Sequence, residues 1–313
     1  MKKYLKYCLL FILPLIIVAI PLEYMIRLVP NPYKYKYDWM QKNAENVEII
    51  ILGSSYTFYG IRPEFFEGNA FNLANVSQGL RHDLYLLNYW SDKYKNLKTV
   101  IFPISYLSWF GQGRLEDSSE SYRCRYYKIY MDCNLYPDIS LYNLELSDFR
   151  TARGKIAKLL FSSNDLGYDK FGWGSTFKLS DKKMTKWIDG TEAEAAVKRH
   201  TVKSLDYDFK YSQMKELAEF CNRHNIQLVL ITTPCWHSYY DSLDRNQLNK
   251  MYELTYKFQK EYHLPYFDYL KDNRFKADDF YDSNHLSDSG AIKFTKILDQ
   301  DIKTYRQYKE AGK

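Results

Sequence analysis

The sequence predicts an α/β fold, in which helices cover both faces of a mostly parallel sheet. Short apolar runs alternate with longer stretches whose apolar residues recur at helical spacing, and this alternation is typical of parallel strands joined by crossover helices. The first run, 47–52, is rich in isoleucine and stops at Gly53, and runs of the same kind occur at 98–104 and 226–232. Such runs indicate strands buried on both faces of a sheet.

Two shorter apolar runs, 70–73 and 264–269, complete a set of five expected strands. Helices are indicated where apolar residues follow at three- and four-residue intervals, as Leu80, Leu84 and Leu87 do. The expected helices span 78–94, about 142–160, a stretch around 214–221, about 244–262, and a last helix that starts at Ser287 as its N-cap.

The amino terminus is typical of an export signal. Three lysines within residues 1–6 precede an uncharged apolar run from Tyr7 to Leu22. Sixteen residues are short for a membrane-spanning helix, but residues 24–26 extend the run towards the roughly 20 that are needed. Because no small-x-small cleavage site follows, we expect residues 1–29 to be an uncleaved signal-anchor, with the lysines in the cytoplasm. A cleaved signal peptide is the alternative.

Beyond the anchor, residues 30–46 form a polar stalk rich in tyrosine and lysine, and residues 47–313 form one large domain. Within that domain, residues 106–205 lack a sustained period and contain no clear strand, so they are expected to be an inserted cap over the carboxyl edge of the sheet. Cys124 and Cys133 lie in this insertion, and a disulfide between them is possible outside the cytoplasm.

The composition excludes several classes of protein. With 46% hydrophobic and 26% charged residues the chain is globular. Its net charge is +6, but lysines and arginines are scattered among acids, which argues against a nucleic-acid-binding face. The acidic cluster Asp278, Asp279, Asp282 with His285 lacks the spacing of a known metal loop. No metal or organic cofactor is therefore expected.

The residues with recognisable chemistry come from two distant places. Gly53-Ser54-Ser55 follows the first strand, at the carboxyl edge where open α/β folds bind their ligands. Asp282 and His285 lie three residues apart before the last helix. A serine hydroxyl becomes a good nucleophile when an imidazole removes its proton and a carboxylate orients that imidazole. These residues therefore suggest a Ser-His-Asp site.

This order of motifs resembles the SGNH, or GDSL-like, hydrolases, which place a nucleophile in a Gly-x-Ser motif after the first strand and an Asp-x-x-His motif before the last helix. The resemblance implies a three-layer, flavodoxin-like α/β/α sheet. It also implies that Ser55 is the nucleophile, His285 the general base and Asp282 the residue that orients it.

The remaining motifs of the family concern the oxyanion hole. Its second block resembles residues 71–78 here, with the glycine replaced by Gln78, whose backbone N–H is still a donor. The third block supplies an asparagine after the strand 99–104, but this chain has Ser105 there. The resemblance thus implies an oxyanion hole of Ser55, Gln78 and Ser105, without the asparagine side chain.

Other histidines are expected to lie outside the catalytic set. His237 follows a strand end and is a rival base only if His285 points elsewhere. Surface or capping roles are expected for the remaining four, His82, His200, His224 and His263.

The expected function is that of a membrane-anchored serine esterase or acyltransferase facing the cell envelope. It would act on O-acyl groups, in the first place O-acetyl groups, of an envelope polysaccharide or glycoconjugate. The layout is also similar to that of the DltD-like and AlgJ-like proteins, which assist a polytopic O-acyltransferase partner. A catalytically inactive carbohydrate-binding protein of the same fold is the third possibility, and the missing asparagine favours it.

Overall fold

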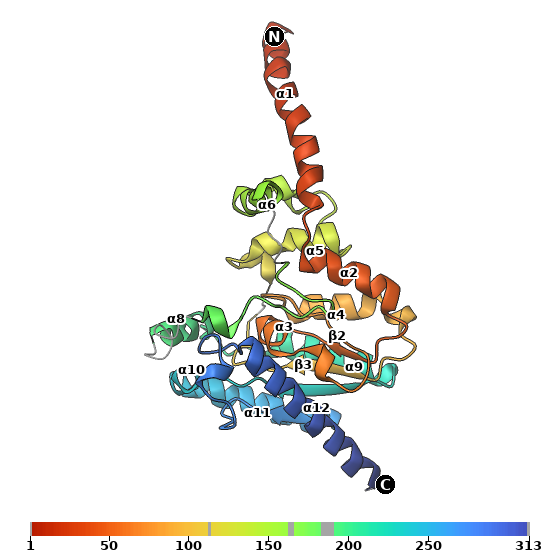
Figure 1. Ribbon diagram of the computed structural model, residues 1–313, viewed down its shortest axis with the longest axis vertical. Coiled ribbons are helices and arrows are strands. Elements are labelled where there is room, and N and C mark those ends of the chain that lie inside the picture. Colours follow the sequence, from red (N-terminus) through yellow and green to blue (C-terminus); the bar gives the residue numbers. More distant parts are fainter. Residues whose placement is uncertain (1, 112–113, 162–165, 183–190, 312–313) are drawn as a thin grey trace. The chain divides into compact units, whose positions relative to one another are not determined.

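The computed structural model describes residues 2–111, 114–161, 166–182 and 191–311, and its chain divides into two compact units. The N-terminal unit comprises residues 1–37 and 115–166, and the sheet unit comprises residues 38–114 and 167–313 (Figure 1). The predicted cap therefore contributes to both units. Its residues 112–113, 162–165 and 183–190 lie outside the described part of the chain.

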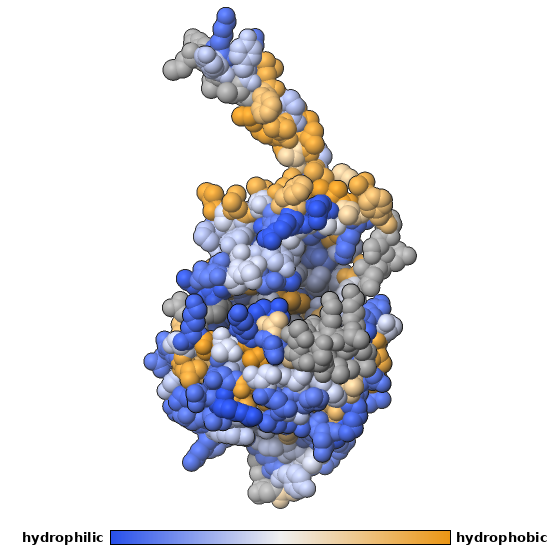
Figure 2. All heavy atoms as spheres, turned by 90° about the vertical axis from the view of Figure 1, so that its left-hand side faces the viewer, coloured by the Kyte–Doolittle hydropathy of each residue, from blue (hydrophilic) through white to orange (hydrophobic). Residues whose placement is uncertain are grey.

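The N-terminal unit begins with the long helix α1 (Lys2–Arg27). Its segment Leu10–Arg27 has a mean hydropathy of 2.0 and is only 6% buried, so this helix is long and apolar enough to cross a membrane. Figure 2 shows apolar residues along much of its length. The orientation and processing predicted for the anchor stay predictions.

Two further helices, α5 (Cys124–Tyr130) and α6 (Phe149–Phe161), belong to the same unit. Helix α6 begins later than the predicted start because Asp148 caps it: the Asp148 carboxylate accepts the backbone N–H of Arg150 at 2.9 Å. Cys124 and Cys133 are buried as free thiols, so the possible disulfide is not formed in this structure.

The predicted stalk contains a helix, α2 (Pro32–Asn43). Its sequence is polar and shows no clear apolar stripe, so no helix was predicted there. Packing supplies the reason for the helix: Trp39 stacks on Phe71 with ring centroids 3.7 Å apart, and Met40 is fully buried. Tertiary contacts of a few large side chains thus outweigh a weak local pattern.

The sheet unit contains five parallel strands in the order β2-β1-β3-β4-β5. Their bounds are β1 Ile49–Ile51, β2 Ala70–Asn72, β3 Thr99–Pro103, β4 Gln227–Thr232 and β5 Tyr266–Asp268. The predicted α/β fold is confirmed, and the strand order is the flavodoxin-like one. Because the chain moves from β1 to β2 and then returns to the other side of β1, the carboxyl ends of β1 and β3 flank the switch point where such folds bind ligands.

Seven helices of the described chain accompany the sheet. They are α3 (Ser55–Gly60), α4 (Leu80–Tyr89), α8 (Thr191–His200), α9 (Asp208–Arg223), α10 (His237–Asp241), α11 (Arg245–Tyr262) and α12 (Asp288–Ala311). Local signals set their ends. Asp244 caps α11 by accepting the Gln247 N–H at 2.9 Å, and Ser287 accepts the Gly290 N–H at the start of α12, as predicted for an N-cap.

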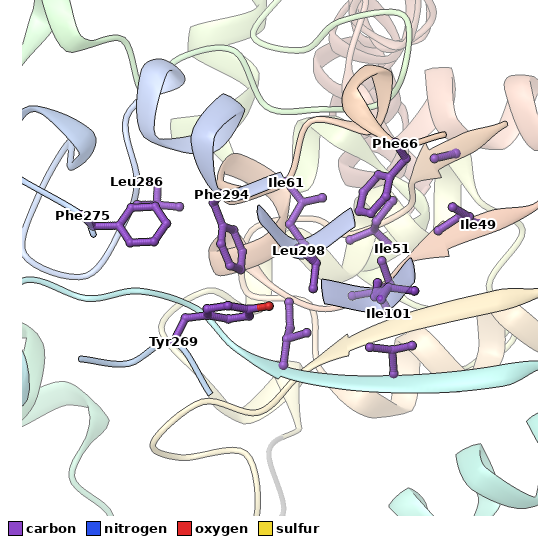
Figure 3. Close-up of a cluster of buried hydrophobic side chains, with 14 of the residues drawn as sticks. Ile49, Ile51, Ile61, Phe66, Ile101, Tyr269, Phe275, Leu286, Phe294 and Leu298 are labelled. Atoms are coloured by element: carbon purple, nitrogen blue, oxygen red, sulfur yellow. The ribbon is translucent and has the colours of Figure 1, made fainter. Parts of the chain in front are cut away.

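Alternate strand residues point to opposite faces of the sheet, and both sets are buried. On one face, Ile51 and Ile101 pack against Phe294 and Leu298 of α12 (Figure 3). On the other face, residues such as Ile50 are fully buried as well. Helix α12 is therefore fixed to the sheet by its apolar stripe, and the loop that precedes it is held at the carboxyl edge.

Gly53, between β1 and α3, offers a direct test of this arrangement. Its φ is +109°, and a Cβ built there would lie 2.3 Å from Pro103 Cγ on β3. We expect Gly53→Ala to lower the free energy of unfolding by about 2 to 6 kcal/mol, the sum of backbone strain and overpacking. Chemical denaturation of the full chain in detergent, followed by circular dichroism, measures this loss.

Gly60→Ala is the matched control in the same unit. Its Cβ would meet only Leu286 Cδ1 at 3.8 Å, an ordinary contact, and alanine favours a helix over glycine by about 0.5–1 kcal/mol. Equal stabilities for the two variants would show that the turn at Gly53 is not as tightly enclosed as the structure indicates.

Candidate active site

Ser55 is placed by the turn that leaves β1. After Gly53 the chain passes Ser54, which precedes the first helical residue, and Ser55 opens α3. A buried hydrogen bond stabilises the turn: the Gly53 N–H donates to the Asp83 carboxylate at 2.9 Å. The Ser55 side chain thus starts from a fixed backbone at the switch point.

His285 and Asp282 lie on the loop before α12. Two backbone contacts hold this loop in place. Phe280 and Leu286 form an isolated β-bridge, and the Trp236 N–H after β4 donates to the Ser283 carbonyl at 2.8 Å. The bridge closes the loop on itself, and the Trp236 contact joins the loop to the segment after β4.

The structure brings the three predicted residues together although 230 positions separate Ser55 from His285. Ser55 Oγ lies 2.9 Å from His285 Nε2, and His285 Nδ1 lies 2.9 Å from both carboxylate oxygens of Asp282. An ionised carboxylate accepts only, so Nδ1 carries the proton that is donated to Asp282. Nε2 is then free to accept the Ser55 hydroxyl proton, which is the tautomer that serine activation requires.

The electrostatics of Asp282 favour its ionised form. Burial raises the pKa of this carboxyl, but the charge of His285 and hydrogen bonds from His285 and the backbone N–H groups of Asn284 and His285 outweigh burial, so its pKa lies below the ordinary value. The two backbone N–H groups donate to Oδ1 at 3.0 and 2.8 Å. Asp282 is therefore positioned by its own loop as well as by the imidazole.

Aromatic side chains surround the imidazole. Tyr56 stacks on the His285 ring at a centroid distance of 5.3 Å, while Phe177 and Tyr59 approach it edge-on at 5.3 and 6.3 Å. Phe177 in turn is stacked between Tyr59 and Tyr281. These rings restrict the orientation of His285 and cover most of its surface, so that its side chain is 15% exposed.

Phe177 belongs to a segment that the sequence placed in the cap. This segment, 167–179, is bonded to both catalytic elements: the Gly174 N–H donates to the Phe58 carbonyl on α3, and the Asp288 N–H at the start of α12 donates to the Phe177 carbonyl, each at 2.9 Å. We call 167–179 the strap. It lies against the serine helix and the histidine loop at once.

The three residues expected to form the oxyanion hole differ in their surroundings. The Ser55 N–H opens α3, where backbone donors have no carbonyl in a preceding turn. The Gln78 N–H instead donates to the Asn75 carbonyl at 3.1 Å, and its side-chain amide donates to Asp83 at 2.7 Å. Both Gln78 donors are thus engaged, and an oxyanion would have to displace one of these acceptors.

Ser105 is also engaged, because its N–H and its hydroxyl lie 2.8 and 2.9 Å from Ser108 Oγ. It lines a cavity of about 10 Å³ together with Tyr56, Thr232 and Tyr239, a volume at the lower limit for one water molecule. A hydroxyl can rotate towards a new acceptor, so the oxyanion roles of Gln78 and Ser105 stay predictions.

One residue of the loop after β2 has a left-handed backbone. Ser77, not Gln78, lies in the left-handed region, with φ of 59°. Glycine adopts this conformation without steric cost, whereas a serine there is uncommon.

His200 is a site residue that sequence reasoning missed. It was expected on the surface or at a cap, but Nδ1 lies 2.7 Å from the Tyr239 hydroxyl and 3.5 Å from that of Tyr56. Burial lowers the pKa of His200 to about 4, and the charges of His285 and Arg199 add to this effect. No spacing in the sequence connects His200 with Ser55.

Among the described residues, His237 lies at the start of α10 with its side chain more than half exposed and 4.0 Å from Asp241. His285 holds the position beside Ser55, so the rival base is not needed. In the part of the chain that the structure describes, no group of three His, Cys, Asp or Glu residues is arranged to hold a metal ion.

The burial of His200 predicts a pH dependence of stability. Because its folded pKa of about 4 lies below the unfolded value near 6.5, the unfolded chain binds more protons between these values, and stability falls as the pH falls from 6.5 to 4. The loss amounts to about 3 kcal/mol for the 2.5-unit difference. We expect His200→Gln, which cannot titrate but can still bond the Tyr239 hydroxyl, to lack this part of the loss.

Urea denaturation of the full chain in detergent at pH 4 to 7 measures the difference. The substitution His237→Gln, at an exposed histidine of the same unit, controls for the change of side chain. Parallel pH curves for wild type and His200→Gln would show that His200 is not buried as the structure places it.

Comparison of the sequence with protein-family models and with curated proteins finds no match. Among solved structures, the chain is similar to a proposed acylhydrolase of Bacteroides fragilis, with 10% identity, a TM-score of 0.41 and coverage of 85% of this chain and 95% of that one. It is also similar to a GDSL-like lipase of Bacteroides thetaiotaomicron, with 12% identity, a TM-score of 0.40 and coverage of 88% and 100%. At these identities and scores the likeness does not extend to function.

Proposed function

We propose that the protein is a serine-dependent esterase or acyltransferase that forms an acyl-enzyme on Ser55. The observation that carries this proposal is the continuous hydrogen-bonded chain from Ser55 Oγ through His285 to Asp282, with each contact at 2.9 Å. A pair of such contacts on one imidazole, with the carboxylate on Nδ1 and the hydroxyl on Nε2, is the arrangement that activates a serine.

In the proposed reaction, His285 Nε2 takes the Ser55 proton while Oγ bonds to the ester carbonyl carbon. The tetrahedral intermediate then collapses, the bond to the leaving alcohol breaks, and His285 returns its proton to that alcohol. His285 then deprotonates a water molecule or an acceptor hydroxyl, whose oxygen bonds to the acyl carbon; the bond from that carbon to Ser55 Oγ breaks, and His285 returns the proton to Oγ. Asp282 stabilises the imidazolium in both halves of the reaction.

The negative charge on the carbonyl oxygen needs donors. The Ser55 N–H at the start of α3 is the first, because an N–H in the first turn of a helix has no carbonyl of a preceding turn as its acceptor. Ser105 at the end of β3 and the N–H groups of the 75–78 loop are the candidates for the second, after a rotation or displacement of their present acceptors.

The substrate we propose is an O-acyl, in the first place O-acetyl, group of an envelope polysaccharide or glycoconjugate. Two features support this choice: the apolar helix α1, which suits a single membrane anchor with the sheet unit outside the cytoplasm, and the aromatic rings of Tyr59, Phe177 and Tyr281 beside the imidazole. Rings next to polar groups suit sugars.

Transfer to an acceptor hydroxyl, in company with a polytopic O-acyltransferase, uses the same acyl-enzyme. The aromatic rings packed against His285, whose side chain is 15% exposed, support transfer, because they reduce the access of water that competes with the acceptor for the acyl group.

A serine-reactive fluorophosphonate tests the nucleophile. We expect full-length protein in detergent to be labelled and Ser55→Ala to lose the label completely, since the reagent bonds only to an activated hydroxyl. Ser54→Ala is the matched control, because the Ser54 side chain makes no capping hydrogen bond to α3. Labelling of Ser55→Ala at the wild-type rate would exclude Ser55, and the absence of any labelling in correctly folded protein would favour a binding protein.

Kinetics on an aryl acetate test the role of Asp282. Asp282→Asn replaces the acceptor on Nδ1 by an amide that can donate, which favours the wrong imidazole tautomer. We expect kcat to fall by about 10⁴-fold with KM little changed. Asp278→Asn, at an exposed carboxylate of the same region, is expected to keep the wild-type rate. A loss of less than tenfold for Asp282→Asn would contradict the proposed role.

A further inference from the structure

Helix α6 of the N-terminal unit exposes large apolar side chains. Phe149 and Leu160 are 75% and 71% exposed, and Phe161 at its end is 81% exposed. Phe149 and Leu160 are eleven residues apart (160 minus 149), about three helical turns, and therefore lie on one line along the helix. An exposed apolar face on such a short helix is more than scattered surface hydrophobicity.

The helix also carries positive charge: at about 100° per residue, Arg153 lies near the apolar line, Arg150 to one side of it and Lys158 on the opposite side. Arg150, Arg153 and Lys158 are exposed, and the sequence of α6 contains no acidic residue. Aromatic and aliphatic side chains interspersed with arginine and lysine are typical of a helix that lies in the interface of a membrane with anionic lipids. The charge is complementary to phosphate headgroups, and the long basic side chains reach them while their stems remain among apolar groups.

Buried polar contacts fix which face of α6 points outwards. Lys155 is 8% exposed, and its Nζ lies 2.5 Å from Glu145 and 3.1 Å from the Tyr130 hydroxyl. Glu145 itself is fully buried. Because a buried lysine is costly without its partner, α6 cannot turn Phe149 and Leu160 inwards while this ion pair persists.

The segment that contains Glu145, the partner of Lys155, is also bonded to the end of α1. The Glu23 carboxylate on α1 accepts the backbone N–H groups of Glu145 and Leu146, both at 2.9 Å, and Arg27 lies 2.7 Å from Glu23. Glu23 and Arg27 are the charged residues that close the apolar segment of α1. The segment that holds Lys155 is thus attached at the point where α1 becomes polar.

A second apolar group lies in the segment between α5 and α6. Ile139 is 97% exposed, Leu141 72% and Leu144 46%. In Figure 2, apolar residues gather on both sides of the place where α1 meets its unit. We call α6 together with residues 139–144 the platform.

We propose that the platform is a bilayer-binding surface that lies in the headgroup region of the membrane from which α1 emerges. This inference rests on the proposed membrane anchor and adds a second, monotopic contact to it. It follows from the continuity of the platform with the polar end of α1 and from its combination of exposed aromatic, aliphatic and cationic side chains. The N-terminal unit then contacts the membrane through the platform as well as through α1.

Nitroxide labels on the full chain, in vesicles of phosphatidylcholine and phosphatidylglycerol, test this proposal. Single cysteines replace Leu160 and Ile139 in a Cys8→Ser background, since the other four cysteines are buried. We expect both labels to be about tenfold more accessible to oxygen, relative to a soluble nickel complex, than a label at Glu253 of α11, because oxygen concentrates among acyl chains. Glu253 is 62% exposed on a charged helix.

A further label at Ile16 of α1 separates this proposal from the one on which it rests. A lipid-protected Ile16 with water-exposed Leu160 and Ile139 overturns the platform but keeps the anchor; a water-exposed Ile16 overturns the anchor. The variant Arg150→Gln/Arg153→Gln/Lys158→Gln tests the charges. In this variant we expect the oxygen accessibility of the Leu160 label to depend much less on the presence of phosphatidylglycerol in the vesicles. An unchanged dependence would show that these cations do not contact headgroups.

Discussion

The close approach of β1 and β3 at Gly53 is the constraint on which the candidate site depends. No Cβ fits between Gly53 and Pro103, and the positive φ of Gly53 turns the chain sharply into α3. The turn is also tied down by Asp83, whose burial raises the pKa of its carboxyl to about 6 against the hydrogen bonds from Gln78 and Gly53. Both hydrogen bonds end on Asp83 Oδ1, while Oδ2 is buried without a hydrogen-bond partner among the described residues. The Gln78 side chain thus bonds the residue that holds the serine turn, and the oxyanion role of its backbone N–H stays a prediction.

The second half of the site depends on a different kind of interaction. Helix α12 is held by apolar packing of Phe294 and Leu298 on one face of the sheet, and this packing carries the loop of Asp282 and His285 to the carboxyl edge. Backbone bonds to the loop then set its fine position. The nucleophile and its base therefore come from two separately stabilised elements, which meet in the Ser55–His285 hydrogen bond and in the stacking of Tyr56 on His285. The strap 167–179 connects the same two elements and presses Phe177 against the imidazole.

The N-terminal unit differs from the sheet unit because polar contacts are buried inside it. Its interior contains an ion pair, Lys155 with Glu145, and Glu23 caps backbone N–H groups there. Polar contacts of this kind specify orientation more than they stabilise. They leave the apolar side chains of α6 outside, which is unfavourable in water and favourable in a lipid interface.

The sequence by itself determined the α/β class, the five strands, the apolar helix α1 and the three residues that meet at the switch point, because strand runs, helical periodicity and the order of two motifs are local signals. Strand ends shifted by one or two residues and the start of α6 shifted further, since capping by Asp148 is visible only once the helix is known. The helix α2, the neighbours of His285 and the partners of Gln78 and His200 depended on tertiary structure alone. They arise from contacts between residues far apart in the chain, and packing of this kind leaves no period or spacing for a single sequence to show.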